Sequence, residues 1–280
     1  MVDLRPGVAA YARLSYIREL YGDMAGATEV MKLAVNAGYL HDPEPLAWSL
    51  VQLGNLYFHQ GQLAAAESEC QTALHVFPHY AHAQAALARV RGAQQRYAEA
   101  IELYRQATGA VPSPDTITAF GDLLAFAGTQ EDAKKQYALV EYVEGVNAAK
   151  NDTYTRQLAL FYADHDRQLD EAVKLAELES TRRRDIYTYD TLAWVYYKAG
   201  RLTEAQQAMV QALRLGTKDA VLFFHAGMIA YGAGEPEKAT HYLQLALKTN
   251  PYFSLSDAAH ARRILTKLER LDERGGPLAK

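Results

Sequence analysis

The stretch that decides the fold runs from Ala47 to Tyr80 and reads AWSLVQLGNLYFHQGQLAAAESECQTALHVFPHY. Gly61 divides it into two segments, and each segment carries apolar and small residues at the i, i+3, i+4, i+7 spacing of one helical face. Pro78 ends the second segment, because proline cannot continue a helix. The stretch therefore predicts two short helices joined by a turn. Neither helix can bury its apolar face alone, so the pair must pack against similar pairs.

Similar pairs recur along the chain at a spacing of 34 residues. The residues that recur in register are small residues and prolines, namely Gly54 and Ala88, Ala66 and Ala100, Pro78 and Pro112, Ala193 and Gly227, and Ala205 and Ala239. Small residues at these positions let two helices cross closely, where a larger side chain would not fit. We therefore interpret them as packing positions.

The period and the order Leu-Gly-x-x-Tyr, Ala, Ala-Leu, Pro resemble the tetratricopeptide repeat. The residues that carry this resemblance are Leu53, Gly54, Tyr57, Gly61, Ala66, Ala73, Leu74 and Pro78. Cys70 departs from the pattern, because an aromatic residue is usual there, whereas Tyr104 and Tyr137 fill the position in later pairs. The resemblance covers residues 8–271 and implies an all-α fold. That fold is a right-handed α-solenoid of about seven helix-turn-helix pairs with a C-terminal capping helix.

The expected domain organisation follows this repeat. The pairs are expected at about residues 8–41, 47–80, 81–113, 114–147, 152–185, 186–219 and 220–253, with the capping helix at 254–272. Residues 1–7 resemble the tail of a preceding repeat, so we expect a longer parent array, and residues 273–280 are expected to be a disordered tail. Between the first two pairs, Pro43 and Pro45 are expected to keep the backbone extended and to bar helix until after Pro45.

Composition and charge restrict the function classes. The chain has 280 residues with 49% hydrophobic content, which is typical of a folded protein. Its net charge of −4 disfavours nucleic acid as a partner, and its single cysteine excludes an internal disulfide. No apolar run approaches the roughly 18 residues that a membrane span needs. The compartment stays undetermined: a soluble, cytoplasmic protein is slightly favoured, and a leader upstream of Met1 is an open alternative.

Signatures of catalysis and of metal binding are missing from the sequence. It contains no Gly-x-Gly-x-x-Gly, no Walker loop, no His-Glu-x-x-His and no Gly-x-Ser-x-Gly. Histidines gather at His59, His75, His79 and His82, but Pro78 falls between His75 and His79, which are four residues apart, and ends the helix there. We therefore expect a non-catalytic protein without a metal or cofactor.

The resemblance implies that the first helix of each pair lines a concave groove, which holds peptides or helices of partner proteins in this family. The residues expected to line the groove and to contact a partner are Asn55, Phe58, Arg89, Asp122, Arg156, Asp190, Trp194, Tyr197, Phe224, Met228 and Tyr231. Asn55, Arg89 and Arg156 are expected to act as polar selectors, and the two arginines can grip a carboxylate in a bidentate manner.

The aromatic and methionine residues near the C-terminal end allow two interpretations. Exposed, clustered aromatic residues mark partner sites, which favours Trp194, Phe224 and Tyr231 as contacts. Alternatively, the same side chains pack sideways onto neighbouring helices as additional core. Burial in the structure distinguishes these interpretations.

Three functions are compatible with the sequence. We expect a scaffold that binds a peptide or protein segment in its groove. The alternatives are a structural module that forms homo-oligomers through the array ends, and a regulatory or substrate-recruiting part of a larger enzyme or secretion complex. One branch of the family clamps the C-terminal carboxylate of chaperones with lysines and asparagines. Asn55 matches that arrangement, but no lysine joins it in the expected groove.

Overall fold

The computed structural model describes residues 7–149 and 155–273, so the predictions for residues 1–6 and 274–280 lie outside the described residues. Within the described ranges the chain forms fifteen α-helices, and the one β contact is an isolated bridge between Tyr39 and Asp42. The predicted all-α fold class is therefore confirmed.

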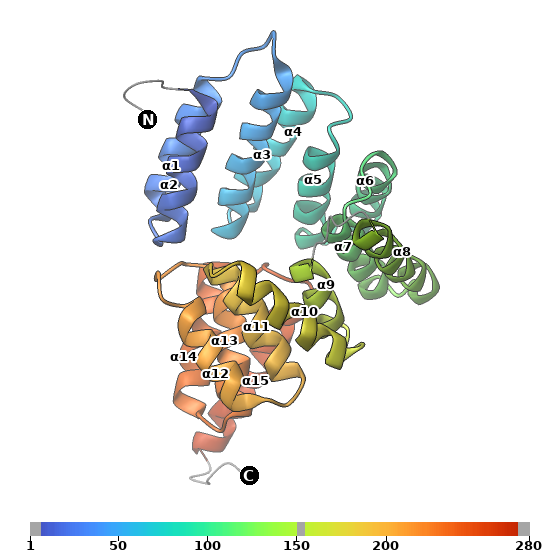
Figure 1. Cartoon of the computed structure of the whole chain (residues 1–280). Helices are drawn as coiled ribbons and strands as arrows, with labels where there is room; N and C mark the ends of the chain where they lie inside the picture. Colours follow the sequence, from blue (N-terminus) through green and yellow to red (C-terminus); the bar gives the residue numbers. More distant parts are fainter. Residues whose placement is uncertain (1–6, 150–154, 274–280) are drawn as a thin grey trace. The chain divides into compact units, whose positions relative to one another are not determined.

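The chain divides into two compact units, which we call the N-terminal unit (Met1–Leu139 and Gly216–Lys218) and the C-terminal unit (Val140–Leu215 and Asp219–Lys280). Helices of the N-terminal unit are α1 (Val8–Leu20), α2 (Met24–Asn36), α3 (Pro43–His59), α4 (Leu63–Val76), α5 (Ala81–Ala93), α6 (Tyr97–Ala110), α7 (Pro114–Phe126) and the first half of α8 (Gln130–Ala149). Figure 1 shows these helices as successive pairs.

The C-terminal unit contains the second half of α8 and seven further helices. These are α9 (Thr155–Asp164), α10 (Leu169–Arg182), α11 (Ile186–Lys198), α12 (Leu202–Ala212), α13 (Ala220–Gly232), α14 (Pro236–Thr249) and α15 (Asp257–Glu273). The described helices thus form seven consecutive pairs followed by one final helix, as the sequence predicts.

Close helix crossings explain why small residues recur in register. A Cβ atom on Gly54 would lie 3.1 Å from the Sγ of Cys70, and one on Gly227 would lie 2.7 Å from the Cγ of Leu243. At the corresponding crossing of α7 and α8, a Cβ atom on Gly121 would lie 2.5 Å from the ring of Tyr137. Cys70 therefore occupies the place that Tyr137 fills in a later pair, so the departure from the repeat pattern leaves the packing role unchanged.

The prolines between the first two pairs do not delay the second pair. Helix α3 begins at Pro43 and includes Pro45, so the expectation of an extended backbone until after Pro45 was wrong. Proline is tolerated in the first turn of a helix, because the backbone N–H groups there have no partner within the helix. Asp42 precedes Pro43 as the N-cap residue.

The first helices of successive pairs lie side by side within each unit. In the N-terminal unit, α1 contacts α3, α3 contacts α5, and α5 contacts α7. In the C-terminal unit, α11 contacts both α9 and α13. Each row brings together the side chains that the sequence assigns to a groove.

The N-terminus of α11 has a side-chain cap with a measurable contribution to stability. The carboxylate of Asp185 accepts hydrogen bonds from the backbone nitrogens of Tyr187 and Thr188, both at 3.0 Å. Partial burial disfavours the charged carboxylate, but the hydrogen bonds from Thr188 and Tyr187 outweigh this effect and keep the pKa of Asp185 below its usual value.

We expect Asp185→Ala to lower the free energy of unfolding by about 0.5–2 kcal/mol, because two N–H groups lose their acceptor. Urea titration followed by circular dichroism measures this change. Asp185→Asn is the matched control, since asparagine caps helices about as well as aspartate. A loss for the asparagine variant as large as for the alanine variant would contradict the capping role.

Candidate functional site

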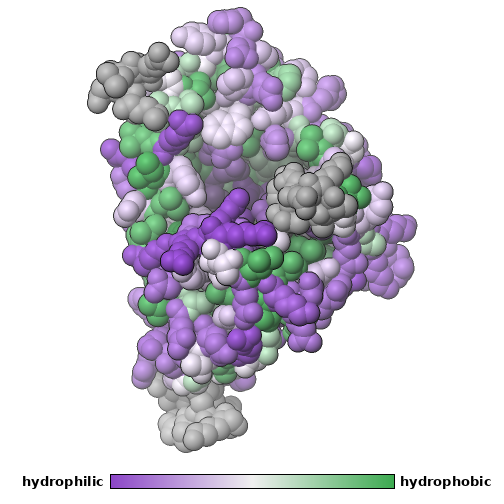
Figure 2. All heavy atoms as spheres, in the orientation of Figure 1, coloured by the Kyte–Doolittle hydropathy of each residue, from purple (hydrophilic) through white to green (hydrophobic). Residues whose placement is uncertain are grey.

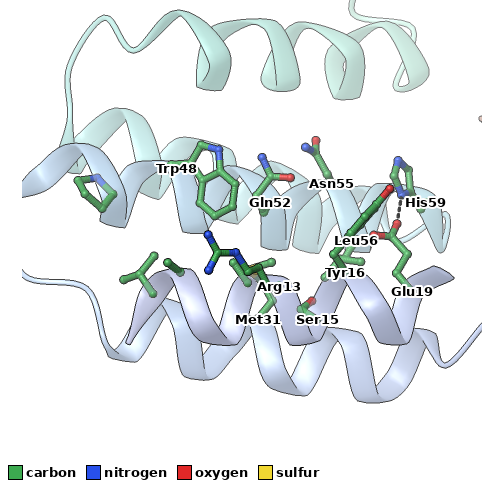
Figure 3. Close-up of a pocket in the computed structure, with 14 residues that line it drawn as sticks. Arg13, Ser15, Tyr16, Glu19, Met31, Trp48, Gln52, Asn55, Leu56 and His59 are labelled. Carbon is green, nitrogen blue, oxygen red and sulfur yellow. Dashed lines mark hydrogen bonds and ion pairs between the residues drawn. The ribbon is translucent and has the colours of Figure 1, made fainter. Parts of the chain in front are cut away.

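A cavity of about 540 Å³ lies between α1 and α3 in the N-terminal unit (Figure 3). Its lining residues are Val8, Ala9, Ala12, Arg13, Ser15, Tyr16 and Glu19 from α1, Met31 from α2, and Pro45, Trp48, Gln52, Asn55, Leu56 and His59 from α3. The volume is within the range of small-molecule and side-chain pockets in proteins, about 300–1,000 Å³.

Helical periodicity explains which side chains of α3 line this cavity. Trp48, Gln52, Asn55 and His59 follow one another at i, i+4, i+7 and i+11, so they share one face of α3. Figure 3 shows these four side chains in succession along that helix. Opposite them on α1 the buried lining residues are the small Ala12 and Ser15, which leave room between the helices.

The cavity has an apolar floor and a partly exposed aromatic rim. Met31 and Leu56 are buried in its floor, whereas Trp48 is 37% exposed and Tyr16 is 49% exposed. At one end, the Nδ1 of His59 lies 3.0 Å from the Oε1 of Glu19, and this pair links α3 to α1 (Figure 3). Exposed aromatic side chains around an apolar hollow are typical of a surface that receives another apolar group.

A second cavity of about 260 Å³ lies between α3, α5 and α7. It is lined by Trp48, Val51, Gln52, Asn55, His82, Ala85, Ala86, Arg89, Tyr104, Asp115, Thr116 and Ala119. Trp48, Gln52 and Asn55 line both cavities, so the two adjoin across α3. We call the two cavities together the N-terminal groove.

Arg89 is the central charged residue of this groove. Its Nη2 donates a hydrogen bond of 2.6 Å to the Oδ1 of Asn55, and its guanidinium lies 4.3 Å from the ring centroid of Phe58. Burial lowers the pKa of Arg89, against weaker opposing effects of Tyr104 and Cys70. Three residues that the sequence places in a groove, Asn55, Phe58 and Arg89, are therefore in direct contact.

Most of the other predicted groove residues lie in the C-terminal unit, where several are core. Trp194, Phe224 and Met228 are each at most 6% exposed. Phe224 packs against the rings of Trp194 and Phe253, with centroids 5.9 and 5.6 Å away. Of the two interpretations of the aromatic residues, additional core therefore describes these three side chains.

The other predicted residues of this unit either bind a polar partner within the chain or are only partly buried. Asp190 is buried, and it binds the ring of His225. Tyr197 and Tyr231 are partly buried, and Tyr231 accepts a hydrogen bond of 2.7 Å from Lys267.

Two other polar residues of the predicted groove interact with residues other than Asn55, Phe58 and Arg89. Asp122 is exposed on α7 and accepts a hydrogen bond of 2.9 Å from the hydroxyl of Tyr137. Arg156 lies on α9 in the C-terminal unit, near enough to Asp185 to favour its ionised form. The predicted set is therefore divided between the two units.

Sequence reasoning missed Trp48 and Gln52 as groove residues. It followed Asn55 and Phe58 on α3, and the side chain of Phe58 is almost entirely buried. The signal that could have found the cavity is the neighbouring row from Trp48 through Gln52 and Asn55. A tryptophan next to the packing face of a helix either packs into the core or takes part in a surface site. Trp48 is partly exposed, which favours a surface site.

Other kinds of site receive no support from the described part of the chain. Across residues 7–149 and 155–273 there is no group of three or more His, Cys, Asp and Glu side chains placed to hold a metal ion. In the same ranges no helix is both long and apolar enough to cross a bilayer. Burial raises the pKa of Cys70 to about 12, which keeps its thiol protonated. On the face drawn in Figure 2, hydrophilic residues are mixed with small hydrophobic patches.

Comparisons with known proteins agree with the repeat. Family models described as tetratricopeptide repeat match residues 45–112 and residues 191–252. The first match covers most of α3 and all of α4, α5 and α6, and the second covers most of α11 and all of α12, α13 and α14. No curated protein matches the chain significantly.

Solved structures show similarity at the level of the fold. A tetratricopeptide repeat protein from Parabacteroides merdae ATCC 43184 is 16% identical, with 94% of this chain and 98% of that chain covered and a TM-score of 0.51. PilF of Pseudomonas aeruginosa is 19% identical, with 79% and 98% covered and a TM-score of 0.41. The APC/C hetero-tetramer Cut9-Hcn1 contains a chain that is 17% identical, with 88% and 48% covered and a TM-score of 0.48.

Proposed function

Because the chain is a tetratricopeptide-repeat protein, we propose that its N-terminal groove binds a segment of a partner protein. Tetratricopeptide repeats generally act as non-catalytic scaffolds for protein interaction, and a scaffold needs an accessible surface with apolar and polar contacts. The observation that carries the proposal is the pair of adjoining cavities, which share Trp48, Gln52 and Asn55.

The groove offers both kinds of contact. Its apolar part is the cavity between α1 and α3, where the side chains of Tyr16 and Trp48 are partly exposed. Its polar part lies around Arg89 and Asn55, on α5 and α3. An apolar anchor with polar groups beside it is the usual composition of a protein-binding surface.

The size of the groove fits a short extended segment. Adjacent packed helices lie about 8–10 Å apart, so the row from α1 to α7 spans about 24–30 Å. An extended chain covers about 3.3 Å per residue, so roughly eight residues cross the row. A segment of this length can place one side chain in each of the two cavities.

The test is site-specific photo-crosslinking of the full chain in extract of the source organism. A photoreactive amino acid replaces Gln52, which lines both cavities. In the matched control it replaces Gln71, which is exposed on α4 and lines neither cavity. We expect a distinct partner protein to be crosslinked from position 52 and not from position 71.

The partner is then identified by mass spectrometry, and the crosslinked peptide locates the bound segment. In the protein that carries the photoreactive residue at position 52, the additional substitution Trp48→Ala is expected to reduce the crosslink several-fold. The substitution removes an aromatic ring that borders the apolar cavity between α1 and α3. Equal crosslinking from both positions, crosslinking from position 71 alone, or crosslinking only to a second copy of this chain would each contradict the proposal.

A further inference from the structure

We infer that the N-terminal groove selects a segment in which a side-chain carboxylate lies about three residues from a large apolar side chain. The carboxylate binds Arg89, and the apolar side chain fills the cavity between α1 and α3. This inference rests on the proposed function, and it adds the chemical class of the ligand.

Arg89 lacks a carboxylate partner among the described residues. Its side-chain contacts are with Asn55 and with the face of Phe58. Its Nε is buried and has no hydrogen-bond partner. A guanidinium carries five N–H donors, so the contacts within the chain leave donors of Arg89 unsatisfied.

The surroundings make a carboxylate the ligand that best completes this arrangement. Burial lowers the pKa of Arg89, because the charged guanidinium loses part of its hydration. An ionised partner compensates for lost hydration better than a neutral one, since charge-assisted hydrogen bonds are about twice as strong as neutral ones. Asn55 and Phe58 hold the guanidinium in place, so little side-chain entropy is lost when it binds.

The position of Arg89 in the row favours a side-chain carboxylate over a chain terminus. Arg89 lies on α5, between α3 and α7, and the second cavity extends from it to both of these helices. A segment that crosses the row therefore continues on both sides of Arg89.

The apolar requirement comes from the neighbouring cavity across α3. Met31 and Leu56 form a buried apolar floor, and the partly exposed rings of Tyr16 and Trp48 border it. Neighbouring helices are about 8–10 Å apart, which an extended chain covers in about three residues. The two subsites thus specify two residue types and their approximate separation.

The test uses synthetic peptides and the purified full chain. Each fluorescent nine-residue peptide is blocked at both ends and carries one Trp and one Asp in a Gly/Ser background, at separations from one to six residues. Matched peptides replace Asp by Asn, replace Trp by Ser, or have a free C-terminal carboxylate as their only acid. Fluorescence anisotropy measures the dissociation constants.

We expect the tightest binding at a separation of two to four residues, with a loss of about tenfold or more for Asp→Asn in the peptide. Arg89→Gln in the protein should remove this preference. Arg105→Gln, a change at an exposed arginine on α6, should leave it unaltered. The preference should also weaken as the salt concentration rises. Circular dichroism verifies that both variants fold, and the peptide comparison does not depend on any variant.

Three outcomes overturn the inference. They are equal affinity for the Asp and Asn peptides, tighter binding of the peptide with only a terminal acid, and no binding by any peptide up to millimolar concentration. Crosslinking from position 52 to a partner segment without an acidic residue would overturn this inference alone. The absence of a specific crosslink from that position would instead contradict the proposed function.

Discussion

Phe224→Ala is expected to destabilise the C-terminal unit by about 3–5 kcal/mol, because it removes a buried aromatic ring and leaves a cavity. Phe224 is 1% exposed on α13, and its ring lies near those of Trp194, Phe253 and His260. These neighbours come from α11, from the α14–α15 connection and from α15. The substitution therefore removes contacts that hold four segments of the unit together.

The two tryptophans allow this loss to be measured in one unit. Trp48 lies in the N-terminal unit and Trp194 in the C-terminal unit. In a Trp48→Phe background, urea unfolding followed by the fluorescence of Trp194 reports the C-terminal unit. Val221→Ala is the matched control, because Val221 is 38% exposed on the same helix and its truncation should change stability by less than about 0.5 kcal/mol.

A change below about 1 kcal/mol for Phe224→Ala would show that the ring is not core. Such a result would favour the other interpretation of the sequence, in which Phe224 is exposed and contacts a partner. The conservative substitution Phe224→Leu preserves most of the buried volume, and we expect it to cost less than the alanine change.

The repeat architecture was predictable because its signals are local and periodic. Gly54, Ala66 and Pro78 each mark a crossing or a helix end, and the same residue types return 34 positions later. The contact between Asn55 and Arg89 could also be anticipated, since the two residues are 34 apart and occupy equivalent positions on adjacent first helices. Periodicity therefore predicts the pairs and some contacts between neighbouring pairs.

Burial on the first helices was not predictable in the same way. Trp194 and Phe224 have the spacing of groove residues, but Phe253 and His260 pack against Phe224. Phe253 lies in a connection without helical periodicity, so no spacing rule places its ring. Whether a side chain on the first helix of a pair is exposed therefore depends on segments outside the neighbouring first helices, such as the connection that carries Phe253.

The final prediction concerns a buried ion pair in the C-terminal unit. The Nδ1 of His225 lies 2.9 Å from the Oδ1 of Asp190, and both residues are at most 7% exposed. The His225 ring also stacks on Trp194, with centroids 4.1 Å apart, and Trp194 donates a hydrogen bond of 2.7 Å to Asp164. Asp257 on α15 adds further negative charge, and so does Asp164 on α9 above the value of about 6 to which burial raises its pKa.

These carboxylates determine how the pair responds to pH. Burial alone would lower the pKa of His225, but the charge and hydrogen bond of Asp190, with smaller contributions from Asp164 and Asp257, raise it above 6.5. A histidine whose pKa is higher in the folded than in the unfolded state contributes stability below the unfolded value. That contribution is lost as the pH rises through the folded value. The C-terminal unit should therefore become less stable between about pH 6.5 and alkaline pH.

Asp190→Asn separates the charge from the hydrogen bond. The amide oxygen of asparagine still accepts from the Nδ1–H of a neutral His225, but it cannot stabilise the imidazolium. We expect a cost of about 2–3 kcal/mol at pH 6 and a smaller cost at pH 9, because a higher pH favours the neutral histidine in the wild type and so removes the contribution of the charge. Urea unfolding at each pH, followed by Trp194 fluorescence in the Trp48→Phe background, measures both values.

Trp194 also provides a direct signal of the charge on His225. A protonated imidazole stacked on an indole quenches its fluorescence, so the folded wild type should brighten as the pH rises through the pKa of His225. In Asp190→Asn this transition should shift to lower pH, because the negative charge that favours the imidazolium is gone. His225→Gln should remove this contribution and leave only the transition of Asp164, which accepts the hydrogen bond of Trp194 and whose pKa burial raises to about 6. An equal stability loss for Asp190→Asn at pH 6 and pH 9, with an unshifted fluorescence transition, would mean that Asp190 only accepts a hydrogen bond. The charge of the pair would then contribute nothing to the stability of the unit.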